Sequence, residues 1–144
     1  MNKIHLILLI SVVIVTIIVL GSQSNPSDKK NEPIFHVTLA NPEMYENRIY
    51  SDTIILEKGE YEFRFVPNGD SPQNLDISLK GNEFEFYENF ILNGTLHETG
   101  ISEYYTWDYD GEKFLIIQNQ KEISIHINPN GNVNGSVSVD IIRN

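Results

Sequence analysis

The sequence has no cysteine at any of its 144 positions. Disulfide bonds, thiolate metal sites such as blue copper, and lipid attachment through a cysteine are therefore excluded. No stretch beyond residue 21 keeps a helical hydrophobic period for long, which argues against a helical bundle. The fold must consequently be stabilised by the core of a β structure alone.

Basic residues are also scarce, with 10 Lys and Arg against 20 Asp and Glu and a formal net charge of −10. A chain this acidic repels phosphate backbones, so nucleic acid is not expected as a partner. The charge suits solubility, cation-rich surroundings or a basic partner.

Long apolar runs are confined to one segment, Ile4–Leu20, which follows Lys3. A helix of this length would span about 25 Å, slightly less than the hydrocarbon core of a bilayer. Residues 1–21 are therefore predicted to be a hydrophobic helix that is either a cleaved signal peptide or an N-terminal membrane anchor. In both cases the positive-inside rule places the rest of the chain outside the cytoplasm, secreted or held at the membrane.

Residues 22–32 contain no large apolar side chain and are predicted to be a flexible linker. The remaining residues, 33–144, suffice for one domain with a sizeable core. Short β-branched and aromatic runs alternate there with Asn, Gly, Pro and Asp, which is typical of strands and turns. The sequence predicts an all-β fold, an antiparallel β-sandwich or jelly-roll of eight or nine strands. The expected strands are 34–39, 53–57, 60–66, 75–79, 83–87, 101–109, 113–118, 123–127 and 137–141.

Asp110-Gly111 is the strongest hairpin signal in the chain. A hairpin there would place Asp108 opposite Lys113, and would put Tyr105, Trp107, Phe114 and Ile116 on the core side. The other face would carry Tyr104, Leu115 and Ile117. Two explanations are open for that second apolar face: a covering loop at 89–100, or a contact patch for a partner, ligand or membrane.

No catalytic, cofactor-binding or metal-binding residues are predicted. There is no nucleophilic cysteine and no serine in a strand-to-helix elbow. The histidines His36, His97 and His126 lack the spacing of a local metal motif. The acids Asp108, Asp110 and Glu112 are better explained by turn formation and pairing with Lys113, and the segment 130–135 by residues that tolerate positive φ.

Two sequons begin at Asn93 and Asn134, and both fall in predicted turns. In an exported domain they are possible glycosylation sites. The longer loop expected around Asn93 makes it the preferred site of the two.

The segments 59–66, 75–79 and 135–141 resemble the GOLD domain of the emp24/gp25L/p24 type, with Gly59, Tyr61, Phe63 and Phe65 in the place of a Gly-x-Tyr-x-Phe-x-Phe strand. The resemblance implies a non-catalytic sandwich that is used for protein contacts. The paired cysteines of that family are not present, so its cargo-receptor role is not carried over.

Three functions remain open. The first is an exported or membrane-anchored, non-catalytic module for protein–protein contact or self-association at the cell surface, with Tyr104, Leu115 and Ile117 as its contact patch. The second is a carbohydrate-binding module that stacks glycans on exposed aromatic side chains. The third is an extracytoplasmic hydrolase, for which the sequence offers no constellation of residues.

Overall fold

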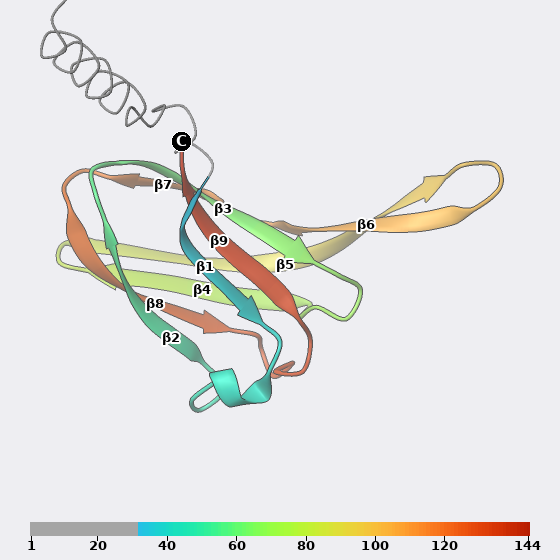
Figure 1. Cartoon of the computed structure of the whole chain (residues 1–144), viewed down its shortest axis with the longest axis horizontal. Helices are drawn as coiled ribbons and strands as arrows, with labels where there is room; N and C mark the ends of the chain where they lie inside the picture. The colour runs from blue at the N-terminus through green and yellow to red at the C-terminus, as the bar shows by residue number, and fades with distance from the viewer. Residues whose placement is uncertain (1–31) are drawn as a thin grey trace, which may run out of the picture.

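The computed structural model describes residues 32–144. The predicted signal peptide or anchor at 1–21, and the predicted linker except its last residue, lie outside these residues. The described residues form two antiparallel sheets packed face to face, with nine strands in total (Figure 1). The predicted β-sandwich is therefore confirmed.

The smaller sheet has four strands in the order β1-β9-β3-β7. Its strands are β1 (Pro33–Leu39), β9 (Val137–Arg143), β3 (Gly59–Pro67) and β7 (Phe114–Ile117). The larger sheet has five strands in the order β2-β8-β4-β5-β6. These are β2 (Tyr50–Leu56), β8 (Lys121–Asn128), β4 (Asn74–Gly81), β5 (Phe84–Glu98) and β6 (Glu103–Asp110).

The core lies between the sheets and is built from alternating residues of each strand. Tyr61, Phe63 and Phe65 of β3 point inward, as strict alternation in the sequence predicts. The same holds for the predicted apolar rows of β4, β8 and β9, whose members are Leu75, Ile77, Leu79, Ile123, Ile125, Ile127, Val137, Val139 and Ile141. Period-two alternation thus identified the buried face of these strands from sequence.

Most connections cross from one sheet to the other. Only β4–β5 and β5–β6 join neighbours in one sheet, and the segment between β1 and β2, which contains the short 3-10 helix η2 (Pro42–Met44), crosses from the smaller sheet to the larger. The turn after Asp110 also crosses. It leads from β6 in the larger sheet to β7 in the smaller one, so the predicted hairpin between these two strands is wrong.

Gly111 is needed at this crossing because it lies against the core. Its φ is +152°, and a Cβ at this position would lie 2.6 Å from Cδ1 of the buried Phe90. The Asp110-Gly111 turn therefore lets the chain pass close to the core as it crosses from one sheet to the other. The predicted proximity of Asp108 and Lys113 is nevertheless confirmed, with Lys113 Nζ 2.9 Å from a carboxylate oxygen of Asp108.

The loop expected at 89–100 is not a loop. Residues 89–98 belong to β5, which has 15 residues and extends beyond its partner β4, since β4–β5 pairing ends at Ile91. From Ile91 onward β5 pairs with β6 as far as Glu98 and Glu103. The result is a two-stranded ribbon, residues 92–109, that projects beyond both sheets and is here called the arm (Figure 1).

Candidate functional site

The predicted contact patch of Tyr104, Leu115 and Ile117 does not exist as one surface. Leu115 and Ile117 are 4% and 1% exposed and belong to the core, whereas Tyr104 lies on the arm and is 51% exposed. The cause is that β7 pairs with β3 instead of β6. The faces of β7 are exchanged as a result, so that Phe114 and Ile116, expected in the core, are exposed.

The arm is anchored at its root by an aromatic cluster in the core. Leu92 and Tyr109 are cross-strand partners and both are buried. The ring of Tyr109 lies 5.1 Å from that of Phe65, and its hydroxyl donates a hydrogen bond to the Pro72 carbonyl oxygen. Burial raises the pKa of Tyr109, so this hydroxyl keeps its proton and the anchor is neutral. The direction in which the arm leaves the sandwich is thereby fixed.

The inner face of the arm continues the core face of the larger sheet and carries Leu96, Tyr105 and Trp107. Trp107 lies across Gly94, its cross-strand partner, and a Cβ on Gly94 would be only 2.7 Å from Cζ3 of the indole. Trp107 is partly buried, and its ring stacks on Tyr105 with centroids 5.8 Å apart. Beyond Trp107 the face is open, because Leu96 and Tyr105 are exposed.

The outer face of the arm is held by polar and stacking contacts. His97 stacks on Tyr104, its cross-strand partner, at 4.9 Å, and His97 Nε2 lies 2.8 Å from the hydroxyl of Thr106. Asn93 donates a hydrogen bond to Asp110 near the root. These contacts give the ribbon a defined conformation although neither of its faces is covered at the tip.

The tip itself exposes an apolar side chain between acids. Ile101 is 96% exposed, and it lies in the turn between Glu98 and Glu103, the last pair of the ribbon. Thr99 closes this turn, since its backbone N–H and its hydroxyl both bond to the Ser102 carbonyl oxygen. The turn therefore presents Ile101 to solvent in a defined position between two carboxylates.

Among charged side chains, the arm and the residues on either side of it carry only acidic ones. Residues 81–112 contain eight Asp and Glu and no Lys or Arg. The first cation after this segment is Lys113, which is paired with Asp108. A positively charged surface would therefore be attracted to the arm, and a second acidic copy would be repelled.

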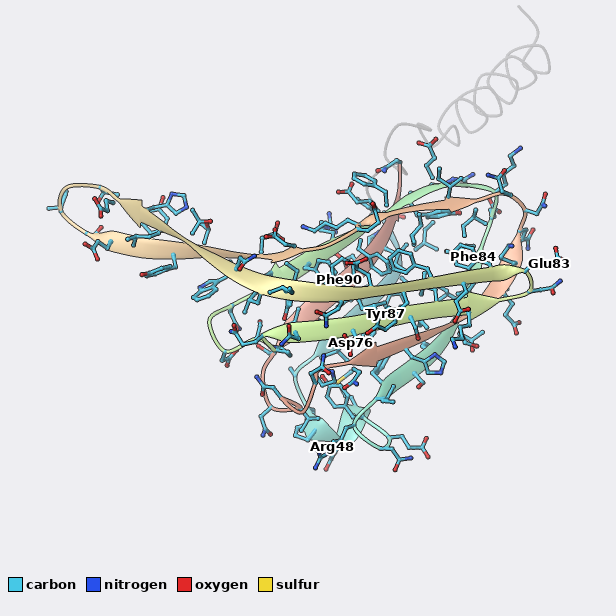
Figure 2. All side chains as sticks on the ribbon, turned by 180° about the vertical axis from the view of Figure 1, so that it is seen from behind. Arg48, Asp76, Glu83, Phe84, Tyr87 and Phe90 are labelled. Carbon is cyan, nitrogen blue, oxygen red and sulfur yellow. The ribbon has the colours of Figure 1, made fainter. Side chains whose placement is uncertain are left out.

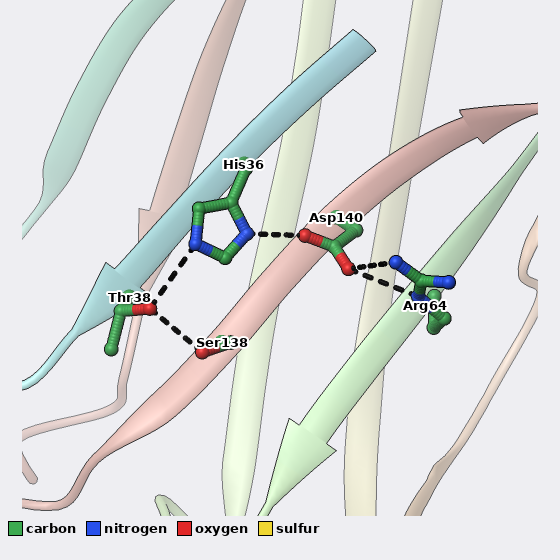
Figure 3. Close-up of polar contacts among 5 residues, drawn as sticks. All are labelled: His36, Thr38, Arg64, Ser138 and Asp140. Atoms are coloured by element: carbon green, nitrogen blue, oxygen red, sulfur yellow. Dashed lines mark hydrogen bonds and ion pairs between the residues drawn. The ribbon is translucent and has the colours of Figure 1, made fainter. Parts of the chain in front are cut away.

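A polar network crosses the outer face of the smaller sheet (Figure 3). Asp140 on β9 accepts hydrogen bonds from Arg64 Nε and Nη2 on β3, at 3.0 and 2.7 Å, and its other oxygen lies 2.5 Å from His36 Nδ1 on β1. Thr38 Oγ1 lies 2.8 Å from the Ser138 hydroxyl. Because His36, Asp140 and Arg64 sit side by side in the ladder, the network joins three strands.

The electrostatics of the network stabilise its carboxylate. Burial of Asp140 by itself would raise the pKa of that carboxyl, but hydrogen bonds from His36 and Arg64 outweigh burial and hold the pKa below its usual value. The charged carboxylate is consequently the form that the folded state prefers.

The order of groups in this network is similar to that of a nucleophilic triad, with a carboxylate, an imidazole and a hydroxyl. The catalytic contact is weak, however, because Thr38 Oγ1 lies 3.4 Å from His36 Nε2 and bonds to Ser138 instead. Arg64, the one cationic donor of the network, is occupied by Asp140. The arrangement suits strand joining better than acyl transfer.

The other side chains considered from sequence lie apart from one another. His36 is on the smaller sheet, His126 is on β8 and His97 is on the arm. Among residues 32–144, no group of three His, Cys, Asp or Glu side chains is placed to hold a metal ion. In the segment 130–135, Asn130 and Gly131 have φ of +51° and +96°, as expected for residues chosen for turn geometry.

The two sequons differ in setting. Asn134 is exposed in the turn between β8 and β9, as predicted. Asn93 is exposed but lies within β5, so the predicted turn at that position is wrong. The side chain of Asn93 donates a hydrogen bond to Asp110, so Asn134 is the less hindered of the two asparagines.

Within the described part of the chain, no helix has the length and hydropathy needed to cross a bilayer. Comparison with known proteins yields no match to a family model, to a curated protein or to a solved structure.

Proposed function

We propose that this protein is an exported or membrane-anchored, non-catalytic β-sandwich module that makes protein–protein contacts at the cell surface. The observation that supports this proposal is the arm, which projects from the sandwich and exposes Leu96, Ile101, Tyr104 and Tyr105. A two-stranded ribbon is marginally stable by itself in water. A partner that covers the arm would bury these side chains and stabilise it. The GOLD-like resemblance agrees with a contact role but adds no partner.

A photo-crosslinking residue at position 101 of the full-length protein, in the cells that produce it, tests the proposal. The matched control places the same residue at Ile55, which is apolar and 58% exposed but lies on β2, far along the sheet order from the arm. We expect discrete adducts from position 101 and none of the same mass from position 55. Equal labelling from both positions, or no adduct from any arm position, would contradict the proposal.

Export is tested independently by adding protease to intact producing cells. We expect the folded domain to be accessible from outside, and either released or retained according to whether residues 1–21 are removed. Protection from protease in intact cells, followed by digestion after lysis, would place the domain on the other side of the membrane.

Carbohydrate binding is a second candidate, favoured by the outer face of the larger sheet. Tyr87 is 62% exposed there, and the charge of Asp76 beside it raises the pKa of its phenol (Figure 2). Asn89 donates a hydrogen bond to the same Asp76, which provides the amide and carboxylate pairing that sugar hydroxyls use. Binding to a glycan panel that is lost in Tyr87→Ala, but kept in the inner-face control Tyr105→Ala, would favour this function.

A further inference from the structure

The outer edge of β6 is open along the arm. β6 is the last strand of the larger sheet, and β5 pairs with it without a register shift. Leu92 N–H bonds to the Gln73 carbonyl oxygen on the β4 side, so the even-numbered residues of β5 direct their backbone groups away from β6. Tyr105 and Glu103 are the cross-strand partners of Leu96 and Glu98. Their backbone N–H and C=O groups must point away from β5, because hydrogen-bonded and non-bonded pairs alternate in an antiparallel ladder.

Exposed sheet edges commonly carry charged side chains, lysine above all, or proline or a bulge, and these features hinder pairing with other chains. β6 has no lysine, proline or bulge and carries three acids, Glu103, Asp108 and Asp110, of which Asp108 is paired with Lys113. Acids repel a second copy of the same edge but attract a basic strand. The β5 edge of the arm is different, because residues 89–97 carry no Asp, Glu, Lys or Arg.

The two faces of β6 carry different side chains. Asp108 and Asp110 lie on the outer face with Tyr104, whereas Tyr105 and Trp107 lie on the inner face, with Glu103 on that face at the tip. A strand added to this edge would place alternate side chains on these two faces. Lysine or arginine would suit the outer face, and an apolar residue would suit the inner face.

From this arrangement we propose that the β6 edge binds an extended segment of a partner protein in which basic and apolar residues alternate, by strand addition. The inference rests on the proposed contact function and names the chemistry of the partner. Charge complementarity selects this occupant over a second copy, because four of the seven described cations, Arg64, Lys80, Lys113 and Arg143, are already paired with the chain's own acids.

The probe is a synthetic octapeptide of alternating lysine and valine, capped at both ends, titrated into the full-length protein. Trp107 is the only tryptophan in the chain, so its fluorescence reports directly on the arm. We expect a saturable change in emission that weakens as salt is added. A peptide with the same composition but its lysines in one block, and an alternating glutamate–valine peptide, are expected to give no saturable change.

Glu98 and Glu103 provide a matched pair of variants, because they are cross-strand partners at the end of the arm. Proline at either position removes one carboxylate and one backbone N–H that points away from the other strand. Glu103→Pro blocks the β6 edge and is expected to weaken peptide binding about tenfold, the loss of roughly one backbone hydrogen bond. Glu98→Pro blocks the β5 edge and is expected to leave binding within about twofold of the wild type.

Glu103→Lys and Glu98→Lys repeat the comparison without altering the backbone, in case a proline prevents the arm from folding. Equal effects of the paired variants, equal binding of the block peptide, or an emission change that follows protein concentration without peptide would each overturn the inference. Adducts at position 101 without peptide binding would leave the contact function in place and remove only the β6 edge.

Discussion

At the scale of single residues, Asp140 is the side chain whose setting has the clearest energetic consequence. It is 4% exposed, and its carboxylate joins β1, β9 and β3 through His36 and Arg64. In asparagine one of the two carboxylate oxygens is replaced by an NH2 group, so either Arg64 or His36 loses its acceptor and the other bonds to a neutral oxygen. Asp140→Asn is therefore expected to lower the free energy of unfolding by about 2 kcal/mol, the usual contribution of hydrogen bonds to a charged group. Chemical denaturation measures this difference.

The pH dependence follows from the lowered pKa of Asp140. The unfolded chain holds the proton more tightly than the folded one, so the contribution of this carboxyl is complete above about pH 4 and is lost as the pH falls through its folded-state pKa. Asp140→Asn should flatten this acid-range loss of stability. Asp108→Asn is the control, because Asp108 and Lys113 form a surface pair that is worth at most about 1 kcal/mol. Parallel acid profiles for the wild type and Asp140→Asn would contradict the assignment.

Sequence analysis reached part of this site. Alternation in the sequence directs His36 outward on its strand and Asp140 outward on the last strand. It could not bring the two together with Arg64, because alternation fixes the face of a residue and says nothing of which strand lies beside it. The order of the strands decides this, and here it places His36 beside Asp140, which is 104 positions later in the sequence.

At the scale of elements, the arm depends on the pairing of Trp107 with Gly94. Gly94→Ala would force the indole out of its place, since the new Cβ would meet Cζ3 at 2.7 Å. We expect red-shifted Trp107 emission and a loss of about 1–3 kcal/mol of local stability in amide exchange of the arm, as for other overpacked sites.

Gly69 offers the matched control for this prediction. It also contacts the Trp107 ring, but a Cβ there would lie 3.6 Å from the nearest indole atom, which is an ordinary van der Waals distance. Gly69→Ala should leave both emission and exchange close to those of the wild type. Equal emission and equal amide exchange in the two variants would show that Trp107 does not pack against Gly94.

Element boundaries show where sequence patterns are ambiguous. Every predicted strand exists, but β5 is much longer than predicted because Asn93 and Gly94 have the chemistry of a turn. The segment Phe114–Ile117 has four consecutive apolar residues, so its inward face could not be chosen by alternation. The inward face of this segment was predicted from a hairpin at Asp110-Gly111, but an Asp-Gly pair suits a crossing between sheets equally well.

At the scale of the whole molecule, the proposed division between a sandwich that stabilises the fold and an arm that makes contacts can be tested. The β5–β6 ribbon can be shortened by replacing residues 94–107 with Asn-Gly between Asn93 and Asp108, a hydrogen-bonded pair suited to a two-residue turn. We expect the shortened protein to keep its β circular dichroism and a cooperative transition, with a loss of about 2 kcal/mol or less, because the core residues of both sheets remain. It should also no longer bind the partner that position 101 of the wild type captures.

Failure of the shortened chain to fold would show that the arm is part of the stabilising structure. The two outcomes can be distinguished because the shortened chain keeps the buried pair Leu92 and Tyr109 at the root of the arm. Near-ultraviolet circular dichroism of the tyrosines shows whether this root is still packed. Retained core signals together with lost partner contacts would separate the two roles.

The neighbouring positions of β1 and β9 have a consequence for engineering. Pro33, at the start of the first strand, pairs with Ile142, near the end of the last, so the domain begins and finishes at adjacent points of one sheet. A fold with this layout tolerates insertion into the surface loop of a host protein, and its two ends can be joined by a short peptide to give a circular permutant. New termini at Gly100, where a side chain would meet no other atom within 4 Å, would then divide the arm into two free strands while the sandwich stays closed.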